Sequence, residues 1–155
     1  MNIRLYIVAP FLLLAILGGC IYHSQKKPVT HEKVSDVMGD LESKQAFFAK
    51  NVSRLISYIN SKGYSVTFGE AWRPQEMAEI YAKEGKGIIH SQHTKRLAVD
   101  LNIFDDKGNF LKSDADQRPF GEYWESLCNA NRWGGNFTKH GGHIDDPDHY
   151  EMRSE

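Results

Sequence analysis

Apolar residues recur every three or four positions between residues 35 and 62, and this period predicts the first long helix of the chain. The stripe consists of Leu41, Phe47, Phe48, Val52, Leu55, Ile56 and Ile59. Gly63 follows directly and is typical of a residue that ends a helix. Such a stripe can also bind a partner, but packing in a core is its commoner use.

Apolar and polar residues alternate in the segments that we expect to form strands. Residues 64–68 predict one strand, and residues 97–104 predict a longer one. Residues 105–109 then have the composition of a hairpin loop, followed by Phe110 and Leu111. Residues 149–152 are expected to form a short final strand.

Two further helices complete the predicted architecture. Pro74 suits the first position of a helix over residues 75–83, which carry one apolar face. Residues 117–131 predict a second main helix, and residues 133–148 are rich in glycine and predict a loop. This order of elements predicts an α+β fold with a small, mostly antiparallel sheet packed by helices.

Residues 1–20 differ in composition from the rest of the chain. A basic start at Arg4 precedes an apolar run over residues 5–17, and Leu-Gly-Gly-Cys20 follows. An apolar run this short predicts an export signal rather than a spanning helix. The Leu-Gly-Gly-Cys segment resembles a bacterial lipobox, so we expect acylation of Cys20 and a membrane-anchored lipoprotein on the periplasmic side. A plain signal peptide or an uncleaved anchor is the alternative.

Length, charge and cysteine content narrow the class of protein. Residues 21–34 are polar and predict a tether, which leaves residues 35–155 for one compact domain. Nineteen basic and twenty acidic residues nearly balance, which argues against a nucleic-acid-binding protein. With Cys20 acylated, Cys128 has no partner for an intrachain disulfide, and we expect it to be a small buried side chain.

Three residues carry the chemistry of a zinc site. His93, Asp100 and His149 offer imidazole nitrogens and a carboxylate, and a catalytic zinc takes three such protein ligands and keeps an open position. The spacing of His93 and Asp100 excludes one helix face, so we expect a loop histidine and a strand aspartate. Val99 and Leu101 would then point to the core, with His149 on a neighbouring strand. Taken singly, the three could be a surface histidine, a solvated carboxylate and a hydrogen-bonded core histidine.

The segments around these residues match two motifs of a known family. The first motif, Ser-x-His-x-x-Gly-x-Ala-x-Asp, is matched at Ser91, His93, Ala98 and Asp100. The second motif, an acidic residue three positions before His and an aromatic, is matched at Asp146, His149 and Tyr150. Over about residues 45–152 the chain therefore resembles the zinc D,D-carboxypeptidase and L-alanyl-D-glutamate endopeptidase family, the M15 peptidases. The resemblance implies a Hedgehog/D,D-peptidase-like fold, bound Zn²⁺ and cleavage of peptidoglycan stem peptides.

The resemblance also implies roles for residues outside the ligand set. Asp146 takes the position of the general base, with Asp145 and Asp148 as competitors by proximity alone. Arg73 takes the position of the arginine that stabilises a developing oxyanion, and Ser91 that of a serine that hydrogen-bonds substrate. A Trp-Gly-Gly segment and Asp rather than Glu at position 146 favour the endopeptidase over the carboxypeptidase.

One residue differs from the family motif, and three other histidines are alternative candidates for the site. Arg96 stands where the family has glycine, and a positive φ would be costly for a side chain, so we expect a different local turn. This departure is a hint in favour of a rival hypothesis, a non-catalytic cell-wall-binding lipoprotein with the same fold. His140 and His143 could bind metal or line a substrate groove, and His90 is similarly ambiguous. We expect a flexible loop with incidental histidines instead.

Overall fold

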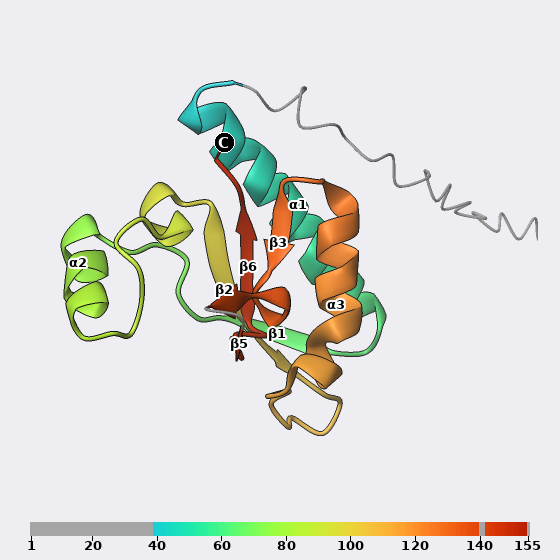
Figure 1. Cartoon of the computed structure of the whole chain (residues 1–155). Helices are drawn as coiled ribbons and strands as arrows, with labels where there is room; N and C mark the ends of the chain where they lie inside the picture. Colours follow the sequence, from blue (N-terminus) through green and yellow to red (C-terminus); the bar gives the residue numbers. More distant parts are fainter. Residues whose placement is uncertain (1–38, 140–141, 155) are drawn as a thin grey trace, which may run out of the picture.

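The computed structural model describes residues 39–139 and 142–154 (Figure 1). Its helices are α1 (Leu41–Ser61), α2 (Gln75–Lys83) and α3 (Asp114–Leu127), with short 3-10 helices η2 (Gln92–Lys95) and η3 (Gly134–Asn136). Its strands are β1 (Ser65–Phe68), β2 (Ala98–Phe104), β3 (Asn131–Trp133), β4 (Thr138–Lys139), β5 (Gly142–His143) and β6 (His149–Met152). The expected signal segment, its Cys20 and the tether lie outside the described residues. Within the described ranges, no helix is long and apolar enough to cross a membrane.

The main sheet has four strands in the order β1-β2-β6-β3, and all its pairings are antiparallel. Directly opposed residues share one face of such a sheet. The register pairs Asp100 with His149 on the central two strands, and Glu151 of β6 lies between Ala98 of β2 and Arg132 of β3. One face of the sheet therefore gathers polar side chains along these strands. The predicted α+β class is confirmed.

The opposite face of the sheet forms the hydrophobic core with α1 and α3, which pack against each other (Figure 1). Its buried residues include Leu55, Ile59, Val99, Leu101, Ile103, Trp124, Leu127, Tyr150 and Met152. Trp124 fixes α3 to the sheet, because its Nε1–H donates to the carbonyl oxygens of Arg132 and Glu151, each at 3.1 Å. Helix α2 lies apart from α1 and α3 (Figure 1). Cys128 is fully buried, as predicted.

The bounds of two predicted helices are corrected by the structure. Helix α1 begins at Leu41 because the Asp40 side chain accepts the Ser43 N–H as an N-cap. The helix expected over residues 117–131 spans Asp114–Leu127 instead. It ends where Cys128 turns extended, and the chain continues into β3. A strand of three residues is too short to show alternation, so the sequence pattern did not reveal it.

The two loops that were expected around the strands contain defined backbone pairings in their described residues. Asp105 closes the loop after β2, because its Oδ1 accepts the backbone N–H groups of Lys107 and Asn109. Phe110 then forms a bridge back to Phe104, which confirms the predicted hairpin. The glycine-rich segment before β6 contains η3 and the antiparallel pair β4–β5, which were not predicted.

Candidate metal centre

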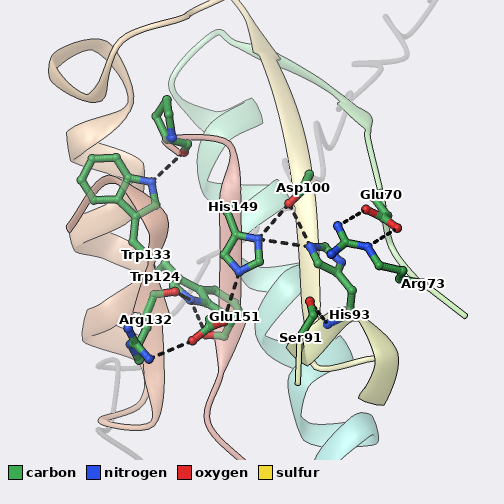
Figure 2. Close-up of polar contacts among 11 residues, drawn as sticks. Glu70, Arg73, Ser91, His93, Asp100, Trp124, Arg132, Trp133, His149 and Glu151 are labelled. Carbon is green, nitrogen blue, oxygen red and sulfur yellow. Dashed lines mark hydrogen bonds and ion pairs between the residues drawn. The ribbon is translucent and has the colours of Figure 1, made fainter. Parts of the chain in front are cut away.

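His93, Asp100 and His149 converge on the polar face of the sheet, as Figure 2 shows. Nε2 of His93 lies 3.2 Å from Oδ1 of Asp100 and 3.2 Å from Nδ1 of His149. The Nδ1 atom of His149 is 3.0 Å from the same Asp100 oxygen. Three donor atoms from a 3-10 turn and two neighbouring strands thus form one compact triangle, in the arrangement that the sequence predicted.

The backbone around His93 explains how its side chain reaches the sheet. Ser91 is the N-cap of η2, because its hydroxyl accepts the backbone N–H of His93 at 3.3 Å. Its carbonyl oxygen accepts both the N–H and the hydroxyl of Thr94. Ser91 is buried and also lines the cavity of the site. Its hydroxyl therefore helps to position His93 at the edge of the cavity.

Arg96 ends this turn in the left-handed conformation that usually favours glycine. Its φ of 54° and ψ of 37° make it the one non-glycine residue with positive φ among the described residues. The backbone N–H of Arg96 donates to the carbonyl oxygen of His93 at 3.2 Å. Its guanidinium lies over the ring of Trp72, 5.0 Å from the centroid. The left-handed turn is thus formed with arginine, and a cation–π contact offsets part of the backbone cost.

Two of the three donors, Asp100 and His149, have strongly shifted pKa values. Burial raises the pKa of Asp100, but hydrogen bonds with His149 and His93 outweigh it and lower this pKa to about 2. Burial lowers the pKa of His149, but hydrogen bonds with Asp100 and Glu151 outweigh it and raise this pKa to about 9. The contacts among these side chains therefore favour a negative charge on Asp100 and a positive charge beside it.

The donor set fits a zinc ion in both chemistry and size. Zinc binds imidazole nitrogen and carboxylate oxygen at about 2.0–2.2 Å, so neighbouring ligands of a tetrahedral ion lie roughly 3.3 Å apart. The triangle of His93, Asp100 and His149 has edges of 3.0 to 3.2 Å. Nε2 is the His93 nitrogen that faces the other two donors. The buried Nδ1 of His93 has no hydrogen-bond partner among the described residues.

The triangle lies in a cavity of about 420 Å³, a volume typical of ligand sites. Its lining comprises Arg73, Gly85, Lys86, Gly87, Ile88, Ser91, Gln92, His93, Asp100, Phe137, Ile144, Asp146, His149 and Glu151. Of the three neighbouring aspartates, Asp146 lines this cavity, whereas Asp145 is exposed and Asp148 is not in the lining. Burial raises the pKa of Asp146 to about 6, which suits a group that exchanges protons near neutral pH.

The loop that carries Asp146 is held closely against β3 and η3. Nε1–H of Trp133 donates to the carbonyl oxygen of Pro147 at 2.7 Å. At Gly134 a Cβ atom would meet the carbonyl oxygen of Asp146 at 2.1 Å, so only glycine allows this approach. The Trp-Gly-Gly segment therefore sets the position of Asp146 beside His149.

Arg73 reaches the other wall of the cavity. Its Nε and Nη2 form a bidentate pair with the carboxylate of Glu70 (Figure 2). Nη1 remains on the side of Gly87. This hydrogen-bonded pairing raises the pKa of Arg73, so the guanidinium stays charged. The backbone N–H of Asp100 donates to the carbonyl oxygen of Glu70 at 2.9 Å, which ties the Arg73 segment to β2.

Among the competing histidines, His90 is separate from the donor triangle, and the side chains of His140 and His143 are not among the described parts of the structure. His90 is exposed and does not line the cavity. His140 lies outside the described residues, and of His143 only the backbone, in β5, is described.

Two acidic residues of the site, Glu70 and Glu151, were not predicted from the sequence. Glu70 stands three positions before Arg73. Glu151 stands two positions after His149, and this spacing places the side chains of His149 and Glu151 on the same face of a strand.

Comparison with known proteins was made at the level of families, sequences and structures. No family model and no curated protein matches the chain. The crystal structure of Serratia marcescens L-Ala D-Glu endopeptidase ChiX is similar, with a TM-score of 0.54 and 13% identity over 82% of this chain and 94% of that chain. The likeness is one of fold.

A second solved structure has a weaker likeness. It is a variant of the vancomycin resistance D,D-pentapeptidase VanY from a VanB-type resistance cassette, in complex with Zn(II). Its TM-score is 0.47, with 16% identity over 68% of this chain and 70% of that chain. The fold expected from the sequence motifs is thus the fold of the endopeptidase ChiX.

Proposed function

We propose that the protein is a zinc peptidase that hydrolyses peptidoglycan stem peptides between L-Ala and D-Glu. The observation that carries the proposal is the triangle of His93, Asp100 and His149 at the cavity, with edges that suit zinc. Asp146 and Arg73 line the same cavity from two other segments, which supplies an acid–base group and a cation beside the proposed ion. The fold is that of an L-Ala D-Glu endopeptidase, which this chain covers over 94% of its length. The choice of bond rests on the Trp-Gly-Gly segment and on Asp rather than Glu at position 146.

The proposed reaction divides the work between the ion and the side chains. A bound Zn²⁺ supplies Lewis acidity toward the scissile carbonyl and lowers the pKa of water. The Asp146 carboxylate accepts the proton of the attacking water as its oxygen bonds to the carbonyl carbon. Asp146 then donates this proton to the amide nitrogen as the C–N bond breaks, so that a carboxylic acid and an amine are formed.

Arg73 is proposed to stabilise the carbonyl oxygen as negative charge develops on it. Guanidinium has five N–H donors, and the pairing with Glu70 uses only two of its nitrogens, Nε and Nη2. Glu70 also restricts the side chain, whose exposed fraction is 13%. An arginine that is already oriented loses little freedom when the charge forms, which is the condition for electrostatic catalysis.

Digestion of purified peptidoglycan, followed by mass spectrometry of the fragments, tests the proposed bond. Cleavage between L-Ala and D-Glu leaves peptides with a new N-terminal D-Glu, and this is the expected product. Release of D-Ala alone would identify a D,D-carboxypeptidase instead. Stoichiometric zinc without turnover on any stem peptide would favour the cell-wall-binding lipoprotein and contradict the enzyme.

A lipid anchor at Cys20 completes the proposal. Its support is the apolar run before Leu-Gly-Gly-Cys20 in the sequence. Processing should be sensitive to globomycin, an inhibitor of lipoprotein signal cleavage, and the wild-type protein should fractionate with membranes. Cys20→Ser should release or mislocalise the protein. A wild-type protein in the soluble periplasmic fraction would replace the lipobox interpretation with a simple signal peptide.

A further inference from the structure

A buried carboxylate lies on the side of His149 that faces away from the donor triangle. Oε2 of Glu151 is 3.2 Å from Nε2 of His149, while Nδ1 of the same ring faces Asp100 and His93 (Figure 2). The side chain of Glu151 is 11% exposed. The two ring nitrogens of His149 therefore have different partners. Nδ1 faces the position of the proposed ion, and Nε2 faces the Glu151 carboxylate.

The sheet holds the Glu151 carboxylate in place. His149 and Glu151 are two residues apart on β6, so their side chains share one face, and Arg132 stands directly opposite Glu151 on β3. Nη1 of Arg132 binds the second oxygen, Oε1, at 3.2 Å. The Arg132 guanidinium lies 4.4 Å from the ring centroid of Phe137, and that ring packs beside His149. Both oxygens of Glu151 are thus committed, one to His149 and one to Arg132.

We infer that Glu151 is a positioning residue for the metal centre, and this rests on the proposed zinc site. Its carboxylate accepts the Nε2–H of His149, fixes that tautomer and ring orientation, and so leaves the Nδ1 lone pair for the ion. The opposite tautomer would set a nitrogen lone pair against a carboxylate oxygen at 3.2 Å. Carboxylate acceptors behind ligand histidines also raise the basicity of the ligating nitrogen.

The alternative role, a structural ion pair with Arg132, explains less of the geometry. The Arg132 side chain is 40% exposed, and an ion pair with so exposed a partner contributes little to stability. That pairing would not require the second oxygen to reach the His149 ring. A purely structural Glu151 would also leave zinc affinity unchanged on substitution, and this separates the two roles by experiment.

The zinc dissociation constant of the full chain, measured by competition with a chromophoric chelator, tests the inference. Glu151→Ala should weaken zinc binding by about 10- to 100-fold. Glu151→Gln should weaken it less, because the amide oxygen still accepts a hydrogen bond. His149→Ala should have the largest effect. Glu122→Gln is the matched control, since it removes the same charge from an exposed position of α3 and should keep wild-type affinity.

A spectroscopic measurement keeps the inference testable where a Glu151 variant fails to fold. In wild-type protein loaded with Zn²⁺, nitrogen-15 NMR of the His149 side chain should place the proton on Nε2 and the metal on Nδ1. A proton on Nδ1 would overturn the inference. So would wild-type zinc affinity in folded Glu151→Ala when His149→Ala has lost zinc. Wild-type protein without zinc affinity, or zinc binding that is unaffected in His149→Ala, would instead overturn the proposed function.

Discussion

Oδ1 of Asp100 lies 3.0 Å from Nδ1 of His149, and these two residues stand directly opposite each other in the pairing of β2 with β6. The register of the sheet therefore sets one edge of the donor triangle, between two of its three donors. A slip of one residue would turn one of the two side chains into the core, where Val99 and Tyr150 now lie. The central strand pair thus fixes Asp100 and His149 relative to each other, and η2 supplies His93.

Removal of the proposed proton acceptor should separate chemistry from metal binding. Asp146→Asn keeps the size of the side chain but cannot accept a proton, so kcat should fall by about 10²–10⁴. Zinc content should stay at the wild-type value, because Asp146 is outside the donor triangle. Asp145→Asn is the matched control on an exposed neighbour and should retain activity. Full stem-peptide cleavage by Asp146→Asn would dismiss it as the base.

Substitution of the cavity arginine should affect turnover without removing zinc. Arg73→Lys keeps a positive charge but loses the planar pairing with Glu70 that orients the donors. Loss of one oxyanion donor typically lowers kcat by about 10²–10³, and we expect a drop of that order. Lys83→Gln, at an exposed position of α2, should leave kcat unchanged. An Arg73→Lys enzyme with wild-type kcat would exclude the proposed role.

Two substitutions at Arg96 should separate backbone strain from side-chain stacking. Arg96→Ala removes the contact with Trp72 and keeps the left-handed backbone, so the protein should lose about 0.5–1 kcal/mol of unfolding free energy. Arg96→Gly removes the same contact but also relieves the positive φ, which is worth about 1 kcal/mol. The glycine variant should therefore be the more stable of the two in urea titrations. Equal stabilities would show that position 96 carries no strain.

The packing of α3 on β3 predicts a position where one methyl group is not tolerated. A Cβ atom on Gly121 would lie 2.1 Å from Cδ2 of Trp133, whose ring is fully buried. Gly121→Ala should lower the free energy of unfolding by about 1–3 kcal/mol through overpacking. Glu122→Ala, on the exposed side of the same helix, should stay within about 0.5 kcal/mol of wild type. A wild-type denaturation midpoint for Gly121→Ala would contradict this packing.

The sequence predicted the central part of the fold because the strands there bury one face. In β2 the alternation of Val99, Asp100 and Leu101 already separates a core face from a polar face, and the structure has the same division. The end of α3 and all of β3 were not predicted. The three-residue strand β3 is extended because it pairs with β6, and a local sequence pattern does not predict such a pairing.

The same limit explains which site residues were missed. Glu151 gains its surroundings from Arg132 on β3, so its role depends on the strand that was not predicted. Glu70 pairs with Arg73, and its carbonyl oxygen accepts the backbone N–H of Asp100, a contact between residues thirty positions apart that the sequence does not show. His93, Asp100 and His149 could be proposed from sequence because their residue types and motif spacing are specific. Their distances from one another required the tertiary structure.

Zinc stoichiometry is the measurement that tests the central claim most directly. Purified wild-type protein, analysed by inductively coupled plasma mass spectrometry, should contain one zinc ion per chain. His93→Ala, Asp100→Ala and His149→Ala should each lose it, because each removes a third of the protein ligands. His90→Ala, an exposed histidine outside the cavity, should retain it. Unchanged zinc content in the three ligand variants, with each variant folded, would contradict the metal centre.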